Sequence, residues 1–176
     1  MATVPIPLDI VAARVFATIT PPRLLQDDGT NYPLASLAFD GVGSAINACF
    51  WEVFASNYGA SNPNVVVRVE WIPAANPGAT QNVVFQAALC AITPGDNQSR
   101  LTDAFATAVA ASAVSVSTTD ANKPKESVIT ISGASLDSLA AGDVLTVKVF
   151  RDAGNASDTY TNDAKVTIVN LEYSDT

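Results

Sequence analysis

One arginine and three aspartates near the C-terminal end of the sequence are the residues whose types and spacing could do chemistry. Arg151 and Asp152 are adjacent, and Asp158 and Asp163 follow a few residues later. Two carboxylates about 5–10 Å apart are enough to hydrolyse a glycosidic bond, and several oxygen ligands can hold a divalent cation such as calcium. An aspartate in a turn can instead accept backbone N–H bonds or pair with an arginine.

We interpret these residues as structural, with Arg151 paired to a neighbouring carboxylate. A cation loop formed by Asp152, Asp158 and Asp163 is the alternative. The spacing differs from the EF-hand loop, which places oxygen ligands at alternate positions around a central glycine. We therefore expect no metal site, and an enzyme that uses paired carboxylates is the poorest of the three interpretations.

The residues that other common kinds of catalytic site require are not present in the expected patterns. The chain has no histidine, which excludes Ser-His-Asp and Cys-His arrangements and histidine-bearing metal sites. The segment Gly41-Val42-Gly43 is followed by neither a third glycine nor a lysine, so it is not a phosphate-binding loop. Cys49 and Cys90 fall in strand-like runs and are expected to be buried small hydrophobic residues. We expect no enzyme activity and no cofactor.

Length, composition and charge restrict the class of protein. A chain of 176 residues with 48% hydrophobic residues suits one domain with a substantial core. The net charge of −8 without a basic run argues against nucleic acid as a partner. No apolar run is long enough for a membrane-spanning helix, and the first residues do not resemble a signal peptide, so we expect synthesis in a cytoplasm.

The elements that must position these residues are expected to be strands. The clearest is 65–72, where Val65, Val67, Val69 and Trp71 alternate with polar residues and so share one face. The expected strands are residues 14–20, 34–40, 45–54, 65–72, 82–92, 127–132, 143–150 and 164–173. The alanine-rich residues 101–113 are interpreted as strand rather than helix, with helical turns near Asp103 and at 136–140. Many strands separated by Gly/Pro turns predict a sandwich or barrel.

Residues 141–173 resemble the closing hairpin of a jelly-roll module found in phage virion proteins. The order that carries the resemblance is Gly142-Asp143, a strand, Arg151-Asp152-Ala153, Asp158-Thr159, Asp163-Ala164, a second strand and Glu172-Tyr173. The resemblance extends back to residue 34 through Phe39-Asp40, Asn57-Tyr58 and the strand that ends at Trp71. The residues before 34 have no counterpart in that module.

The resemblance implies an all-β fold, an antiparallel β-sandwich of jelly-roll type over residues 34–176, with an extended N-terminal arm and first strand in residues 1–33. It also implies a capsid decoration (cement) protein that binds the outer surface of the assembled phage head and stabilises contacts between major capsid proteins. Such a protein would be a homotrimer on the virion surface, assembled in the host cytoplasm, with no nucleic acid or membrane partner. The alternative is a tail, fibre or baseplate domain that binds host surface glycans.

Two groups of residues are candidates for an interface. Pro5, Pro7 and Ile10 belong to an N-terminal segment that either forms a first strand and surface loop or lies as an arm across a neighbouring subunit. Tyr58 and Tyr160 lie in turns, so we expect them to be exposed and available to a partner.

Aromatic residues would serve the glycan alternative as a stacking platform. The candidates are Trp51, Trp71, Tyr32, Tyr58 and Tyr160. Trp71 and Phe50 are expected in the core instead, because an aromatic on an alternating strand is usually buried.

Overall fold

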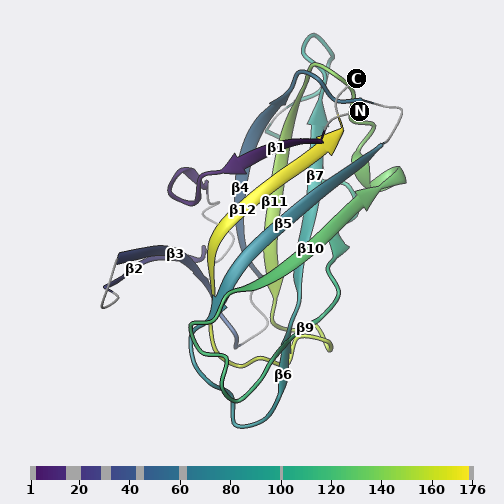
Figure 1. Cartoon of the computed structure of the whole chain (residues 1–176). Coiled ribbons are helices and arrows are strands. Elements are labelled where there is room, and N and C mark those ends of the chain that lie inside the picture. The colour runs from purple at the N-terminus through teal and green to yellow at the C-terminus, as the bar shows by residue number, and fades with distance from the viewer. Residues whose placement is uncertain are drawn as a thin grey trace.

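The computed structural model describes residues 3–14, 21–28, 33–42, 46–59, 63–99 and 101–174 (Figure 1). Its strands are β1 (Thr3–Leu8), β2 (Arg23–Asp28), β3 (Pro33–Phe39), β4 (Ile46–Ala55), β5 (Asn64–Pro73), β6 (Gln81–Val83), β7 (Phe85–Ile92), β8 (Val109–Ala110), β9 (Val114–Val116), β10 (Lys125–Ser132), β11 (Asp143–Asp152) and β12 (Ala164–Ser174). Two short 3-10 helices, η1 (Ile10–Ala12) and η2 (Gly133–Leu136), complete the described elements. No helix in these ranges is long and apolar enough to cross a membrane.

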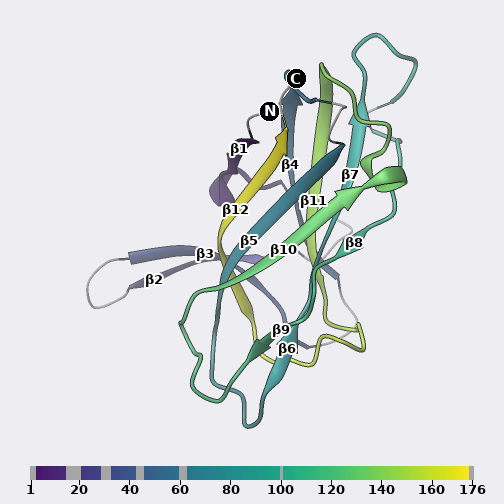
Figure 2. The same cartoon turned by 45° about the vertical axis from the view of Figure 1, so that its right-hand side comes forward.

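The strands form two antiparallel sheets packed face to face (Figures 1 and 2). Sheet A has the order β10-β5-β12-β3-β2, with β1 also paired to β12, and sheet B has the order β4-β11-β7-β8. A small ribbon of β6 and β9 lies at one end. The pairing of β3-β12-β5-β10 against β4-β11-β7-β8 is the jelly-roll arrangement. The expected antiparallel β-sandwich of jelly-roll type is therefore confirmed.

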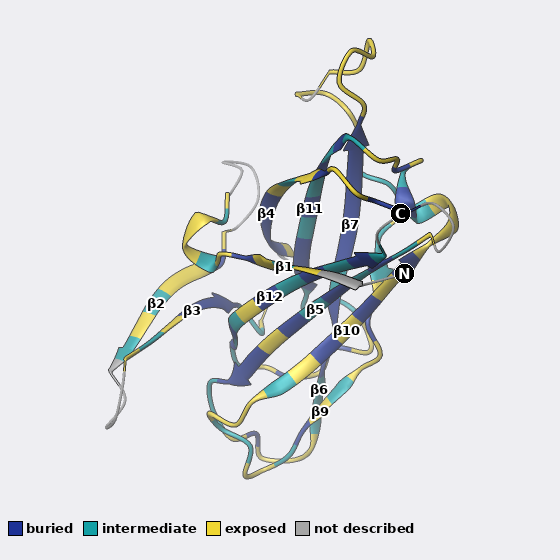
Figure 3. Cartoon of the chain, turned by 45° about the horizontal axis from the view of Figure 1, so that its top comes forward, coloured by how far each residue is buried: buried dark blue, intermediate teal, exposed yellow. Residues whose placement is uncertain are grey.

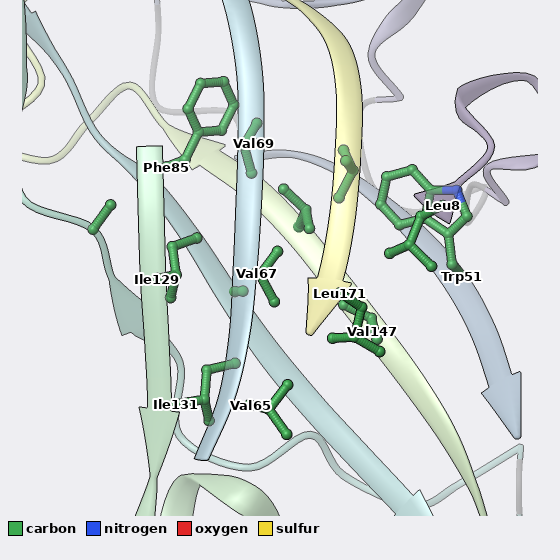
Figure 4. Close-up of a cluster of buried hydrophobic side chains, with 14 of the residues drawn as sticks. Leu8, Trp51, Val65, Val67, Val69, Phe85, Ile129, Ile131, Val147 and Leu171 are labelled. Carbon is green, nitrogen blue, oxygen red and sulfur yellow. The ribbon is translucent and has the colours of Figure 1, made fainter. Parts of the chain in front are cut away.

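The core lies between the two sheets and follows from the alternation in β5. Val65, Val67, Val69 and Trp71 are all fully buried, which confirms the face expected from the sequence. Figure 4 shows the three valines beside Ile129 and Ile131 of β10 and Leu171 of β12. The indole Nε1 of Trp71 donates a 3.1 Å hydrogen bond to the Ser127 hydroxyl, so its polar atom is satisfied inside the core.

The N-terminal residues form the first strand of the chain's own sheet. β1 runs antiparallel to β12 from the pair Thr3↔Ser174 to the pair Leu8↔Val169. Leu8 is buried, whereas Pro5 and Pro7 alternate with it and are exposed. The half-buried Ile10 packs against the main core. The interpretation of this segment as a first strand is confirmed for residues 3–8.

After η1 the chain reaches the side of β4 opposite β11. Arg14 and Phe50 exchange two backbone hydrogen bonds of 2.8 and 3.0 Å. The rest of the strand expected at 14–20 lies outside the described residues, as does Tyr32.

The β2–β3 hairpin projects away from the sandwich (Figure 2). Only the second half of β3 is buried, and most of β2 is exposed (Figure 3). Leu24 on β2 is 57% exposed. Arg23, at the base of the hairpin, pairs with Asp163, and Asp27, near the far end of β2, pairs with Lys165 at 2.8 Å. These ion pairs connect the hairpin to the start of β12.

Two expected elements differ in detail. The strand expected at 82–92 is interrupted at Val84, so that β6 and β7 belong to different sheets. Residues 101–113 contain only the short β8, and the expected turn at 136–140 occurs earlier, as η2. Phe105 and Ala108 pack instead on the outer face of sheet B, where burial of an apolar patch replaces regular strand pairing.

The prediction that residues 141–173 form a closing hairpin is wrong. Both strands exist, but β11 lies between β4 and β7 in sheet B, whereas β12 lies between β5 and β3 in sheet A. The polar loop that joins them therefore crosses from one sheet to the other. Asp158 and Tyr160 of that loop are buried, whereas most of its other residues are exposed or half-buried.

Candidate functional site

Arg151 and Asp158 form a buried ion pair where the loop leaves β11. The exposed fractions of their side chains are 0% and 1%. The Arg151 Nε atom donates to Asp158 Oδ2 and its Nη2 atom donates to Asp158 Oδ1, both at 2.8 Å. The Oδ2 atom also accepts the backbone N–H of Val84 at 3.1 Å. The expected pairing of Arg151 with a neighbouring carboxylate is confirmed.

The same guanidinium binds three backbone carbonyls, one at the end of β3 and two in the loop between β11 and β12. Its Nη1 atom donates to Phe39 O at 3.2 Å and to Asn162 O at 2.9 Å, and its Nη2 atom donates to Tyr160 O. Since β3 belongs to sheet A and β11 to sheet B, these bonds fasten the sheets together. We call Arg151, Asp158, Tyr160 and the carbonyls of Phe39 and Asn162 the Arg151 joint.

The three aspartates of the candidate cation loop have separate protein partners. Asp158 belongs to the Arg151 joint, Asp163 pairs with Arg23, and Asp152 accepts the Gly154 N–H at 3.1 Å. Across the part of the chain that the structure describes, no group of three or more acidic, cysteine or histidine residues could hold a metal ion. The contacts fit the structural interpretation and do not assemble Asp152, Asp158 and Asp163 as ligands.

The expectation that Tyr58 and Tyr160 are exposed is wrong. Their exposed fractions are 2% and 0%. Tyr58 packs edge-on against Tyr173 with ring centroids 5.8 Å apart, and burial raises its pKa. The Tyr160 hydroxyl donates to Ala75 O at 2.7 Å and accepts from Ala75 N at 3.0 Å. Both rings belong to the main core, Tyr58 near the end of β12 and Tyr160 in the loop before its start.

The tryptophans are not a stacking platform either. Trp51 and Trp71 are 5% and 0% exposed, and Trp51 Nε1 donates to Asp9 O at 2.8 Å. Phe50 is 3% exposed, as expected for a core residue. Aromatic surface available to a ligand must come from elsewhere.

A groove with a volume of about 670 Å³ lies on the outer face of sheet B. Strand register places Glu52, Thr146 and Cys90 side by side across β4, β11 and β7. These residues, together with Ile92, line the groove from the sheet. Arg14, Asp103 and Phe105 are among the other residues that line it. We call this the sheet B groove.

Charges of both signs surround the sheet B groove. The Arg14 side chain is 69% exposed and pairs with Glu52 at 2.5 Å. Asp103 is exposed and accepts the Ala104 N–H at 3.0 Å. The Lys148 ammonium lies 5.9 Å from the centroid of the Phe105 ring, and burial lowers its pKa. The sequence did not predict this groove, because its residues are far apart along the chain.

Burial keeps both cysteines protonated, as expected for small hydrophobic residues. Burial raises the pKa of Cys49 well above its usual value. Burial, with smaller contributions from the negative charges of Asp103 and Asp137, raises the pKa of Cys90 to about 11. The two thiols lie on β4 and β7, which are separated by β11, and both are free.

We expect neither thiol to react with a chromogenic disulfide reagent in the native protein near about pH 8, because the thiolate is the reactive form. Both should react once guanidinium chloride unfolds the chain. Native reactivity should rise as the pH approaches the raised pKa of Cys90, and a Cys90→Ala variant assigns that signal. Rapid native reaction at the lower pH would contradict the burial of these groups.

Comparison with known proteins does not assign this chain to a family. No family model and no curated protein matches the chain. Among solved structures, it is similar to the X-ray crystal structure of a carbohydrate-binding module, CBM28, specific for non-crystalline cellulose. The two are 11% identical, the match covers 84% of this chain and 76% of that chain, and the TM-score is 0.36. A likeness of this size says nothing of what this chain binds.

Proposed function

We propose that this chain is a phage capsid decoration (cement) protein that binds the outer surface of the assembled head. Its partners are the major capsid protein and two further copies of itself, as a homotrimer on the virion. The resemblance in residues 141–173 supports the proposal, because the residues that carry it build the sandwich. Arg151 and Asp158 form the Arg151 joint, and the buried Asp143 accepts bonds from Thr93 Oγ1 and Ala140 N, both at 2.7 Å.

The observation that carries the proposal is the projecting β2–β3 hairpin. A two-stranded ribbon is at best marginally stable in water without further packing. Among the described strands, β2 has β3 as its one neighbour, and it carries the exposed Leu24. The ion pairs Arg23–Asp163 and Lys165–Asp27 hold the hairpin against the start of β12 before any partner binds. The hairpin therefore suits contact with another protein, with little ordering cost on binding.

Binding of this kind would stabilise a shell by mass action. A contact that exists only on the assembled head favours the assembled state by the free energy of binding. A stable interface buries about 1,600 Å² in total. This chain would contribute about half of that area from its accessible surface of 8680 Å², and the role requires no catalytic group.

We expect Leu24→Lys to weaken binding to phage heads at least about tenfold, because it places a charge in the centre of the apolar contact. Stability should change by no more than about 0.5 kcal/mol, since the side chain is exposed and lysine is tolerated on edge strands. The measurement is co-sedimentation with heads purified from phage that lack this gene. The matched control is Leu101→Lys, which changes a leucine that is 95% exposed and lines the sheet B groove, away from the hairpin.

Equal binding of both variants would remove the hairpin from the contact. No binding of the wild-type chain to heads would overturn the decoration role itself. Immunoelectron microscopy of intact virions provides an independent check, with label expected evenly over the head. Label confined to the tail would favour the alternative, a tail, fibre or baseplate domain that binds host glycans.

A further inference from the structure

We propose that the sheet B groove binds a neutral oligosaccharide. This inference does not depend on the decoration role, since the groove lies on the outer face of sheet B and the hairpin extends from sheet A. The groove volume of about 670 Å³ falls within the range of small-molecule sites. Its floor spans three strands, about 10 Å at the usual spacing between strands, which is longer than one hexose ring.

Donors and acceptors converge on the groove from both walls. Arg14 provides N–H donors on the β4 side, and Glu52 orients its guanidinium through the 2.5 Å ion pair. Asp103 provides carboxylate acceptors on the opposite side. The Thr146 hydroxyl on the floor can both donate and accept a hydrogen bond. A sugar hydroxyl both donates and accepts, so a single polyhydroxylated chain can satisfy both walls.

The balance of charge favours a neutral ligand. An anion would meet the carboxylates of Glu52 and Asp103 in a protein of net charge −8. A cation would meet Arg14 and the Lys148 ammonium, whose lowered pKa reflects its poor hydration beside Phe105 and Phe150. A fully apolar ligand would desolvate the polar walls without replacing their hydrogen bonds, which is costly.

Apolar surface completes the site. Ile92 and Phe105 line the groove, and strand register continues the floor through Val144 to Phe54, which is 59% exposed. The carbon-bound hydrogens on one face of a sugar ring can pack on these side chains, with the negative face of an aromatic ring favouring that contact. Phe54 therefore offers an exposed aromatic ring, whereas Tyr58 and Tyr160 are buried.

The test is a nuclear magnetic resonance titration of the isotope-labelled full chain with four neutral probes. These are cellopentaose, maltopentaose, mannopentaose and the pentamer of N-acetylglucosamine. At probe concentrations about ten times a millimolar dissociation constant, we expect amide shifts confined to the outer face of sheet B. Thr146, Cys90 and Ile92 should report them with at least one probe. A heparin oligosaccharide and the deacetylated glucosamine pentamer, the charged counterparts, should shift these amides less.

Asp103→Asn is expected to weaken binding of the best probe about tenfold, because it replaces a charge-assisted hydrogen bond by a neutral one. Arg14→Gln should weaken it comparably, and the amide spectrum shows that each variant is folded. The matched control is Glu126→Gln on the outer face of sheet A, where the glutamate side chain is 53% exposed, with no change expected. Absence of groove shifts with all four neutral probes, or stronger binding of a charged probe, would overturn the proposal.

Discussion

Replacing Arg151 by methionine is expected to lower the free energy of unfolding by about 3–5 kcal/mol, the usual cost of breaking a buried ion pair by removing one partner. The variant leaves the Asp158 carboxylate, 1% exposed, with the bond from the Val84 N–H but without its cation. It also removes the donors to the carbonyls of Phe39, Asn162 and Tyr160. Denaturation by urea, followed by tryptophan fluorescence, measures the loss.

Two further variants separate the buried charge from the general effect of losing an arginine. Arg151→Met combined with Asp158→Leu should cost less than the sum of the single changes, because no lone charge stays buried. Arg23→Met breaks an ion pair whose arginine is 61% exposed, and it should cost at most about 1 kcal/mol. If Arg151→Met costs no more than Arg23→Met, the Arg151 joint does not fasten the sheets as described.

The second large effect is expected at Gly41, where Gly41→Ala should destabilise the protein by about 3 kcal/mol, the upper end for overpacking. A Cβ atom there would lie 2.1 Å from Asn162 O and 2.6 Å from the carbonyl carbon atoms of Asn162 and Thr161. Backbone cannot yield as a flexible side chain can. Moreover, the Asn162 carbonyl accepts a 2.9 Å bond from Arg151, so relief of the clash would disturb the Arg151 joint.

Gly78→Ala is the matched control, because a Cβ atom at Gly78 would meet nothing within 4 Å. Alanine there should change stability by no more than about 1 kcal/mol, through the entropy of the unfolded chain. Thermal unfolding of the two variants side by side is the measurement. A similar melting temperature for both would show that the close approach at Gly41 is not a constraint. Non-additivity of Gly41→Ala with Arg151→Met would show that the two features are coupled.

Strands could be predicted from the sequence wherever apolar and polar residues alternate, because the alternation shows which face of the strand is buried. The alternation of Val65, Val67 and Val69 is sufficient for β5, because burial on one face of a strand repeats every second residue. The pairing of β11 with β12 could not be predicted in this way. The sequence of a polar loop is similar whether the loop joins two neighbouring strands of one sheet or crosses to the other sheet. Here the bond from Arg151 to Phe39 O, more than a hundred residues away, helps hold the crossing.

In the candidate site, too, contacts between residues close in sequence could be predicted, and contacts between distant segments could not. Arg151 and Asp158 are close in sequence, so their pairing could be inferred, whereas the inward direction of Tyr160 depends on Ala75 in another segment. The sheet B groove was not predicted, because only the register of β4, β11 and β7 brings Glu52 and Thr146 together with Cys90. No local pattern contains that register.

The central place of β12 in sheet A has a consequence for synthesis on the ribosome. β1, β3 and β5 all pair with β12, which is made after all three of them. At about 5–20 residues per second, the interval between completion of β5 and of β12 lasts several seconds. During that time the apolar face of β5, with Val65, Val67 and Val69, has no β12 beside it. The yield of folded protein should therefore depend on chaperones that shield nascent chains, and slowing translation after β5 should increase aggregation.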